Sequence, residues 1–329
     1  MTQEGPMKSP GFAVRDLTVV LGRGTRAAHV VRGVSWSVAP GATLGVVGES
    51  GSGKSMTVLA AAGLVPPSAA VTGSALVGST DLLKLSRREL EGVRGRRLGF
   101  VFQEPMTSLN PLLTVERQIT EGIEEHLGTT RRVARGRALE LLESVGIPDP
   151  ERRLDAYPHQ LSGGMRQRVM IAIALSCEPD VLIADEPTTA LDVTTQAQIL
   201  EIVRERQQRM GMAVVWISHD LGVVGGLADD VVVMYGGQVV EQAPVETLHR
   251  APAHPYTRGL LGARPLLGSR RDQLTAIPGT PPDPRELPSG CVFFDRCPVK
   301  GDPRCETEVP ALSEVGRRHY ARTFCPEDQ

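Results

Sequence analysis

The sequence predicts an α/β fold in which helices cover both faces of a mostly parallel sheet. Short apolar stretches at Ala42–Val47, Val181–Ala184 and Ala213–Ile217 have the composition of buried strands. The stretch Thr194–Met210, between the last two, is predicted to be a helix. Strands that alternate with helices in this way indicate a parallel sheet with both faces covered.

The first part of the chain predicts an antiparallel hairpin beside this sheet. Phe12–Leu21 and Val30–Val38 alternate apolar with polar residues, and a Gly-Arg-Gly turn follows the first of them. Further on, we expect a helix over Met56–Leu64 and short strands over Val71–Val77 and Arg97–Phe102.

The middle of the chain predicts an inserted helical subdomain, at about residues 104–176. Apolar residues recur at three- and four-residue spacing over Val115–Leu127, Arg131–Val145 and Gly163–Ser176. Beyond the strand at Val181, the sheet is expected to end with short strands near Val231–Met234 and Val239–Val240.

The composition changes near Ala251 to Pro, Gly and Arg, which predicts a separate, core-poor extension. We therefore expect a flexible start over residues 1–10, a main domain over 11–250 and the extension over 251–329. A length of 329 residues is more than one compact core usually holds, which fits this division.

Charge and composition limit the classes of binding partner and the cellular location that we expect. The formal net charge is −2, which makes a nucleic acid a poor default partner. No apolar run approaches the roughly 20 residues that span a bilayer. The first ten residues lack the apolar core of a signal peptide, so we expect a cytoplasmic protein.

A phosphate-binding loop stands between the first buried strand and the helix that follows it. The residues that fit G-x-x-x-x-G-K-[ST] are Gly48, Glu49, Ser50, Gly51, Ser52, Gly53, Lys54 and Ser55. Glycines let backbone N–H groups converge on an anion, and the helix N-terminus adds partial positive charge. Lys54 is expected to reach the β- and γ-phosphates, and the Ser55 hydroxyl to ligate Mg²⁺. The loop alone leaves kinases, GTPases, helicases and transport ATPases open.

A second acidic anchor follows the strand Val181–Ala184. Asp185 is expected to hold Mg²⁺, directly or through water, and Glu186 to orient and deprotonate the attacking water. The bland alternative is that the two acids only cap the turn at Pro187.

A second helix start is also suited to an anion. Leu161, Ser162, Gly163, Gly164 and Met165 combine a side-chain cap with two glycines, so bare N–H groups can meet a phosphate. Taken alone, this stretch is equally well an ordinary capped helix.

These motifs together resemble those of ATP-binding cassette (ABC) proteins, over roughly residues 11–250. Leu-Ser-Gly-Gly resembles the signature motif of that family. Gln103 then matches the Q-loop glutamine, which also contacts Mg²⁺, Asp192 the D-loop and His219 the switch histidine. The resemblance implies a P-loop (RecA-like) ABC ATPase core, with Glu186, His219 and Gln103 as catalytic residues and a partner's signature motif completing the ATP site.

The subfamily follows from longer stretches. Residues 103–111 and 161–168 resemble those of importers for oligopeptides, dipeptides and nickel. His254–Thr257, Ile277–Pro282 and Pro288–Cys291 with Arg296–Pro298 resemble the C-terminal extension of the same ATPases. Met165 resembles the first of the two paired ATPase subunits.

The resemblance implies a peptide-importer ATPase with ATP and Mg²⁺ as cofactors. It implies a second ATPase subunit in a heterodimer, or alternatively a homodimer, two integral membrane permease subunits, and indirect cooperation with an extracytoplasmic binding protein. The location implied is peripheral, at the cytoplasmic face of the membrane. Nickel import and a non-transport regulatory or ribosome-associated ATPase stay open as alternatives.

Other P-loop classes fit less well. A GTPase needs an Asn-Lys-x-Asp guanine reader, and Asn110 is the only asparagine in the chain. Residues 103–162 are too short for the coiled coil of chromosome-type cassettes, and translation-factor cassettes usually carry two P-loops. An exporter is disfavoured by the importer-like Q-loop and extension.

Four cysteines gather late in the chain, at Cys291, Cys297, Cys305 and Cys325. Four thiolates suit a tetrahedral zinc or a [4Fe-4S] cluster, although tight C-x-x-C pairs are missing. The resemblance favours the cluster, with zinc and unligated thiols as alternatives. Cys177, in an apolar helical pattern, is expected to be a core residue.

Two positions depart from the family. Leu21 stands where an aromatic residue commonly stacks on adenine, so we expect weaker base stacking and modest base selectivity. Met56 stands where Thr is frequent after Lys-Ser, which keeps the backbone contact to phosphate but removes a side-chain contact.

Overall fold

The computed structural model describes residues 11–104, 108–188, 191–263 and 277–324. The chain divides into two compact units. The first unit comprises Met1–Ala13, Ser37–Thr43 and Leu76–Ile217, and the second comprises Val14–Trp36, Leu44–Ala75 and Ser218–Gln329. Both are α/β, as the sequence predicts.

The sheet of the first unit is parallel. Its strands β6 (Leu98–Val101), β7 (Val181–Asp185) and β8 (Ala213–Ser218, of which Ser218 falls to the second unit) lie in the order β8-β7-β6. Val181 stands opposite Leu98 on one side and Ala213 on the other. All residues of β7 and β8 are buried, which explains their continuous apolar runs.

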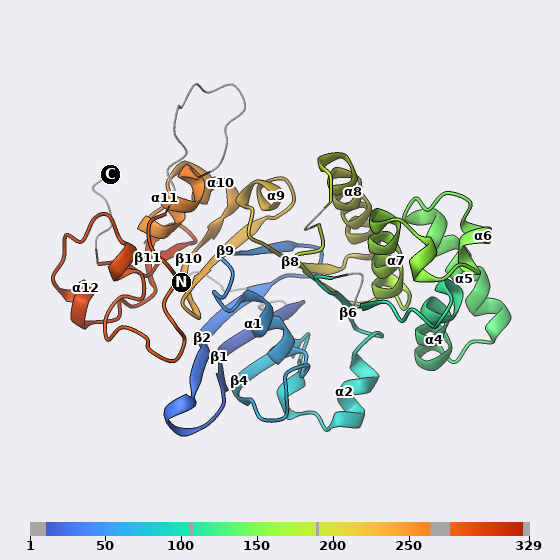
Figure 1. The fold of residues 1–329 in the computed structure, drawn as a ribbon, viewed down its shortest axis with the longest axis horizontal. Coiled ribbons are helices and arrows are strands. Elements are labelled where there is room, and N and C mark those ends of the chain that lie inside the picture. The colour runs from blue at the N-terminus through green and yellow to red at the C-terminus, as the bar shows by residue number, and fades with distance from the viewer. Residues whose placement is uncertain (1–10, 105–107, 189–190, 264–276, 325–329) are drawn as a thin grey trace, which may run out of the picture. The chain divides into compact units, whose positions relative to one another are not determined.

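Four helices of the first unit pack on one another: α4 (Val115–Leu127), α5 (Arg131–Ser144), α6 (Pro150–Leu154) and α7 (Gly163–Leu175). Figure 1 shows them as the green cluster of helices. Helix α7 also packs on β6. It is apolar around most of its circumference because it is buried among these elements. The predicted helical periods are confirmed to within a residue at each end.

The first unit also holds shorter elements and one long helix. They are β5 (Thr80–Asp81), η2 (Leu82–Lys84), α2 (Arg87–Val93), η3 (Pro158–Gln160) and α8 (Val193–Met210). Ser86 and Glu89 form a reciprocal capping box at the start of α2. Gly211, in the left-handed conformation, ends α8.

The second unit contains the strand that leads into the P-loop. This strand, β3 (Thr43–Val47, of which Thr43 falls to the first unit), pairs in parallel with β9 (Asp230–Tyr235). Helix α1 (Lys54–Ala61) follows the loop. Gly45 is required on β3, because a Cβ there would lie 2.1 Å from Val224 Cγ1 on α9 (Leu221–Gly225).

The rest of this sheet is antiparallel, so the strands of the fold are parallel from β3 to β9 and from β6 to β8, and antiparallel beyond β9. From β9 the order continues through β10 (Gln238–Pro244) and β12 (His319–Ala321) to β11 (Ser313–Gly316). Each of these neighbours pairs antiparallel.

The C-terminal extension is therefore neither separate nor core-poor, in contrast to the expectation from its composition. Its strand β12 pairs with β10, and Tyr256, Phe293 and Ala321 are all at most 1% exposed. Its helices are α10 (Val245–Arg250), α11 (Pro255–Gly262), η4 (Phe294–Arg296) and α12 (Arg304–Thr307), and the first two appear in orange in Figure 1. A few large aromatic side chains form this core, although the proline-rich composition of the extension did not indicate one.

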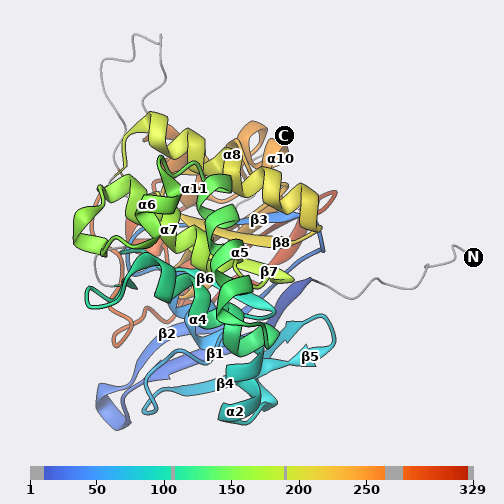
Figure 2. The same cartoon turned by 90° about the vertical axis from the view of Figure 1, so that its right-hand side faces the viewer.

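A four-stranded sheet has the order β2-β1-β4-β5. The two strands of the predicted hairpin are β1 (Phe12–Leu21) and β2 (Ala28–Val38), with η1 (Gly24–Arg26) between them, and β4 (Ala70–Val77) lies beside β1. Their labels are visible in Figure 2. Across the described ranges, no helix has the length and hydropathy needed to cross a bilayer.

Candidate functional site

The P-loop lies in the second unit, between β3 and α1. Gly48, Gly51 and Gly53 all have positive φ angles, of 154°, 78° and 98°. A Cβ on Gly48 would lie 2.2 Å from the Met234 carbonyl oxygen, and one on Gly53 would lie 2.7 Å from that of Val30. Only glycine fits these two positions, because both the backbone angle and the space exclude a side chain.

The side chain of Lys54 points into the P-loop and bonds to its backbone. Lys54 Nζ donates to the carbonyl oxygens of Gly48 at 2.7 Å and Glu49 at 2.9 Å, and the residue is 5% exposed. Helix α1 begins at Lys54 with no side-chain cap on its N-terminal N–H groups. The buried Ser52 Oγ has no hydrogen-bond partner within the described part of the chain. The loop thus combines a cation, uncapped amides and an unsatisfied hydroxyl, as an anion site requires.

The acidic strand end lies in the first unit, at the carboxyl end of β7. Asp185 is 5% exposed. Glu186 has a φ of 44°, which is unusual for a residue with a side chain, and its N–H donates to the Ile217 carbonyl at 3.1 Å. Gln103 Nε2 donates to Glu186 Oε2 at 3.4 Å. The structure therefore brings together two of the predicted catalytic residues, with the carboxylate held in a constrained backbone conformation.

The signature residues form the start of α7 in the first unit. Ser162 is the N-cap, and its Oγ accepts from the Met165 N–H at 3.3 Å. Leu161 is buried beneath the turn, whereas Ser162 and Gly163 are exposed. A Cβ on Gly163 would meet no atom of the described residues within 4 Å. The N-terminus of α7 is consequently open to an approaching ligand.

The remaining predicted residues stand at element ends. Asp192 caps α8, because its carboxylate accepts from Thr195 N–H at 2.9 Å and from the Thr195 hydroxyl at 2.7 Å. These hydrogen bonds lower the pKa of Asp192. His219 is exposed just after β8, and Leu21 is the last residue of β1. Ser50, Ser55 and Met56 lie in the loop and in the first turn of α1.

Three of the four late cysteines line one small pocket in the second unit. They are Cys291, Cys297 and Cys305, and all are reduced. Burial and the neighbouring Cys297 raise the pKa of the Cys291 thiol. Within the described ranges no three His, Cys, Asp or Glu side chains are arranged to hold a metal ion, while Cys325 lies outside those ranges. Cys177 is 6% exposed, which confirms that it is a core residue.

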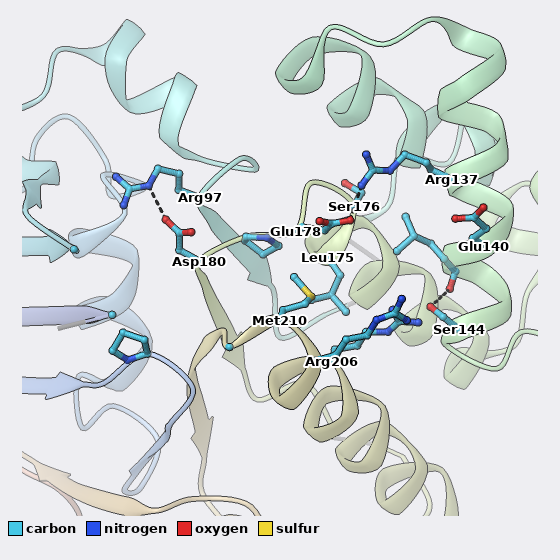
Figure 3. A pocket seen from close by; sticks show the side chains of 17 residues that line it. Arg97, Arg137, Glu140, Ser144, Leu175, Ser176, Glu178, Asp180, Arg206 and Met210 are labelled. Carbon is cyan, nitrogen blue, oxygen red and sulfur yellow. Dashed lines mark hydrogen bonds and ion pairs between the residues drawn. The ribbon is translucent and has the colours of Figure 1, made fainter. Parts of the chain in front are cut away.

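One large pocket of the first unit lies away from these motifs. It measures about 1070 Å³ and lies at the amino ends of the strands, where Arg97, Asp180 and Gly211 precede β6, β7 and β8. Asp185 and Glu186 lie at the opposite end of β7. Figure 3 shows the Arg97–Asp180 pair on its wall, with Nε and Oδ2 2.7 Å apart. The size of this pocket does not make it the nucleotide site.

Sequence reasoning did not single out two side chains that contact the P-loop. Arg296 forms an ion pair with Glu49, and the Tyr256 hydroxyl accepts from the Glu49 N–H. Both residues lie in motifs of the extension, but 247 and 207 positions separate them from Glu49. No local pattern could have indicated these contacts.

Comparison with known proteins agrees with these features. The ABC transporter family matches residues 31–189, and the C-terminal region of oligopeptide/dipeptide transporters matches residues 240–305. The dipeptide transport ATP-binding protein DppD of Escherichia coli is 46% identical over 96% of this chain and 96% of that protein. The oligopeptide transport ATP-binding protein OppD of Bacillus subtilis is 47% identical over 94% of this chain and 87% of that protein.

A solved structure shares the cassette fold. A dimeric post-hydrolysis state of the ATP-binding cassette MJ0796 with ADP and Pi has a TM-score of 0.65 and 28% identity, over 71% of this chain and 98% of that one. The fold, the P-loop and the acidic strand end define a P-loop ATPase with an inserted helical subdomain. The chain belongs to the ABC transporter family, in the group of oligopeptide and dipeptide transport ATP-binding subunits. It is an ATPase coupled to membrane transport.

Proposed function

We propose that this chain hydrolyses ATP to power the import of dipeptides or oligopeptides through a binding-protein-dependent ABC transporter. The observation that carries the proposal is the presence of a cassette and an oligopeptide/dipeptide C-terminal region in one chain. The extension contributes strands to the sheet that contains β3, so the two regions share one core in the second unit. The chain would act at the cytoplasmic face of the membrane, with two permease subunits and a second ATPase subunit.

The phosphates of ATP would bind the P-loop. Lys54 would exchange its two loop carbonyls for the β- and γ-phosphates, and the uncapped amides of α1 would hold the same anions. Ser55, Asp185 and Gln103 offer hydroxyl, carboxylate and amide oxygens, which are the donors that Mg²⁺ prefers. The bound ion supplies charge neutralisation on the phosphates.

Glu186 is proposed as the general base. Its carboxylate takes a proton from water while the water oxygen attacks the γ-phosphorus, and the bond to the β-phosphate oxygen breaks to give ADP and phosphate. Gln103 would hold Glu186 in this role, and its Nε2 lies 3.4 Å from Glu186 Oε2. His219 would contact the γ-phosphate from the end of β8.

Each site is proposed to need two chains. Ser162, Gly163 and Gly164 at the start of α7 would face the γ-phosphate held by a partner's P-loop, so that ATP joins two cassettes head to tail. The exposed, unblocked start of α7 supports this arrangement. Hydrolysis removes the γ-phosphate and lets the pair open, and Gln103 would pass that motion to the permease.

The first prediction tests the base. Glu186→Gln in the assembled transporter should abolish phosphate release, because the amide cannot accept the proton, yet it should retain ATP in a closed pair of ATPase subunits. Phosphate release and retained nucleotide measure the two effects, with Lys54→Ala as the control that should lose ATP itself. Turnover at the unaltered rate would remove Glu186 from the base role.

Copurification separates transport from the alternative functions. Permease subunits captured with the chain support import, whereas ribosomes captured without permeases support a regulatory ATPase. Uptake assays with peptides and with nickel in the same cells then assign the cargo.

The second prediction concerns the late cysteines, which we propose to bind one [4Fe-4S] cluster, with zinc as the alternative ligand. Three thiols line the same pocket, and the Cys291 N–H donates to the Cys305 carbonyl at 2.8 Å, which fixes their two segments together. The chain purified without oxygen should contain about four iron and four sulfide per chain. Cys297→Ser should lower both, whereas Cys177→Ser should change neither. Stoichiometric zinc would replace the cluster, and absence of both would overturn the proposal.

A further inference from the structure

The carboxylate of Glu49, the second residue of the P-loop, is held from the C-terminal extension. Arg296 Nη1 donates to Glu49 Oε2 at 2.6 Å, and Nη2 donates to Oε1 at 3.0 Å. The pairing is bidentate, which is the strongest geometry between a guanidinium and a carboxylate. The Arg296 side chain is 6% exposed and that of Glu49 is 27% exposed, so the pair is largely shielded from water.

The backbone of Glu49 is held by a second group of the extension. Its N–H donates to the Tyr256 hydroxyl at 2.8 Å. Tyr256 is fully buried, and its ring packs against Tyr235 and Phe293 with centroid separations of 4.6 and 5.4 Å. The hydroxyl is therefore presented from a rigid aromatic cluster.

Arg296 is fixed as firmly as Tyr256. Its Nε donates to the Pro278 carbonyl at 2.8 Å, Nη2 to the Ile277 carbonyl at 3.3 Å, and Nη1 to the Tyr235 hydroxyl at 3.2 Å. The hydrogen bonds to Glu49 raise the pKa of Arg296, so this group stays charged at every physiological pH. With five hydrogen bonds on one guanidinium, little freedom is left for it to follow a moving loop.

The held residue is central to the loop itself. Glu49 and Gly48 supply the two carbonyl oxygens that receive Lys54 Nζ. Fixing Glu49 at its N–H and at its carboxylate therefore fixes the backbone from which the lysine must swing to the phosphates. A loop already in its binding conformation loses less conformational freedom when ATP arrives.

We propose that Arg296 and Tyr256 are positioning residues of the ATP site, so that the extension sets the affinity of this cassette for ATP. The proposal rests on the proposed role of the P-loop. Neither residue touches the nucleotide, because both act through Glu49. Their removal should raise the KM for ATP and leave kcat nearly unchanged.

The experiment measures ATP binding by the full-length chain, steady-state hydrolysis by the assembled transporter that contains it, and the unfolding midpoint of the chain. Arg296→Gln and Glu49→Gln should each weaken ATP binding about tenfold, and the double variant should be no weaker than either single variant. Arg296→Lys should recover part of the loss, because it restores charge without bidentate geometry. Tyr256→Phe, which removes one hydrogen bond, should cost about threefold.

Arg304 provides a matched control. It pairs with Asp302 in the same extension, with its Nη2 2.7 Å from Asp302 Oδ2, and its side-chain hydrogen bonds within the described residues all go to Asp302. Arg304→Gln should therefore leave ATP binding unchanged. Glu49→Gln keeps the test informative if Arg296→Gln fails to fold, because Glu49 is partly exposed.

The outcomes separate this inference from the function on which it rests. Normal ATP binding by Lys54→Ala would remove the P-loop from the ATP site and overturn both. If Lys54→Ala loses ATP while Arg296→Gln and Glu49→Gln keep unaltered affinity and KM, only the positioning role is overturned. If the variants lower the unfolding midpoint but leave the KM for ATP unaltered, the contact between Arg296 and Glu49 only stabilises the fold, and the proposal is overturned as well.

Discussion

At the scale of single residues, His254 shows how burial controls charge in the extension. It is 2% exposed, and its Nδ1 accepts from the Tyr256 N–H at 3.1 Å, so it caps α11. Burial lowers its pKa from about 6.5 to about 4, against the opposing effect of Glu241. The ring is therefore neutral in the folded chain at neutral pH.

The third prediction follows from this shift. Between pH 6.5 and 4 the unfolded chain binds a proton at His254 that the folded chain does not bind. The free energy of unfolding therefore has its full value with respect to His254 above pH 6.5. It decreases as the pH falls toward 4, by up to about 1.4 kcal/mol per pH unit. His254→Asn keeps a capping side chain but does not titrate, so its unfolding free energy should fall less steeply over this range in denaturant titrations. Equal slopes for both chains would contradict the shift.

Glu241 is a buried carboxylate that accepts from the backbone N–H of this histidine. It is 0% exposed and accepts from the N–H groups of Ala253 and His254, and His319 Nε2 lies 2.7 Å from its Oε1. Burial raises the pKa of Glu241, but these hydrogen bonds outweigh it and leave the pKa lowered. One carboxylate thus ties β10 to β12 and to the start of α11.

At the scale of elements, the fourth prediction compares two glycines. A Cβ on Gly99 of β6 would lie 2.4 Å from the Ala174 carbonyl oxygen of α7, so Gly99→Ala must push the helix away. We expect the unfolding free energy to fall by about 1–3 kcal/mol. Gly136, inside α5, has no atom of the described chain within 4 Å of such a Cβ, and Gly136→Ala should raise the unfolding free energy by about 0.5–1 kcal/mol. Denaturant midpoints measure both, and equal effects would show that α7 does not rest tightly on β6.

Elements defined by local patterns were predictable. The apolar runs of β7 and β8 and the helical periods of α4 and α5 match the structure to within a residue, because burial imposes those patterns on neighbouring positions. Strands β11 and β12 were missed. They have four and three residues, too few for alternation to show, and β12 is paired by a strand some 80 positions earlier.

The candidate site divides in the same way. Some parts of the site are short contiguous stretches that the local sequence alone identifies: the P-loop, Asp185 with Glu186, and the start of α7. The contact of Gln103 with Glu186 depends on the pairing of β6 with β7, and that of Arg296 with Glu49 on the folding of the extension. Contacts of this second kind come from tertiary structure and leave no periodic signal.

At the scale of the whole molecule, one chain carries two helix N-termini suited to phosphate, at α1 and at α7. The first has uncapped amides behind Lys54, and the second is exposed behind two glycines. ATP binding at the P-loop of a single chain does not explain why the start of α7 is exposed. In the proposed head-to-tail pair, the N-termini of α1 and α7 would both contact phosphates of ATP.

The fifth prediction tests this use of α7. Gly163→Val places its Cβ where no described atom lies within 4 Å, so the chain should fold and bind ATP as before. In the assembled transporter, however, the side chain would stand between α7 and the γ-phosphate held by the partner subunit. ATP turnover should then fall by at least about 100-fold, as it does when a positioned donor of this kind is lost. Phosphate release from the transporter measures turnover, and nucleotide titration of the isolated chain measures binding.

Gly136→Val is the control, because it makes the same change at a helix glycine on α5 whose added Cβ likewise meets no described atom within 4 Å. Its turnover should match that of the unaltered transporter. If Gly163→Val also turned over ATP normally, the start of α7 would have no phosphate to meet, and its two glycines would serve only the local turn. If instead Gly163→Val lost ATP binding in the isolated chain, α7 would belong to the same chain's pocket, and one subunit would suffice for a complete site.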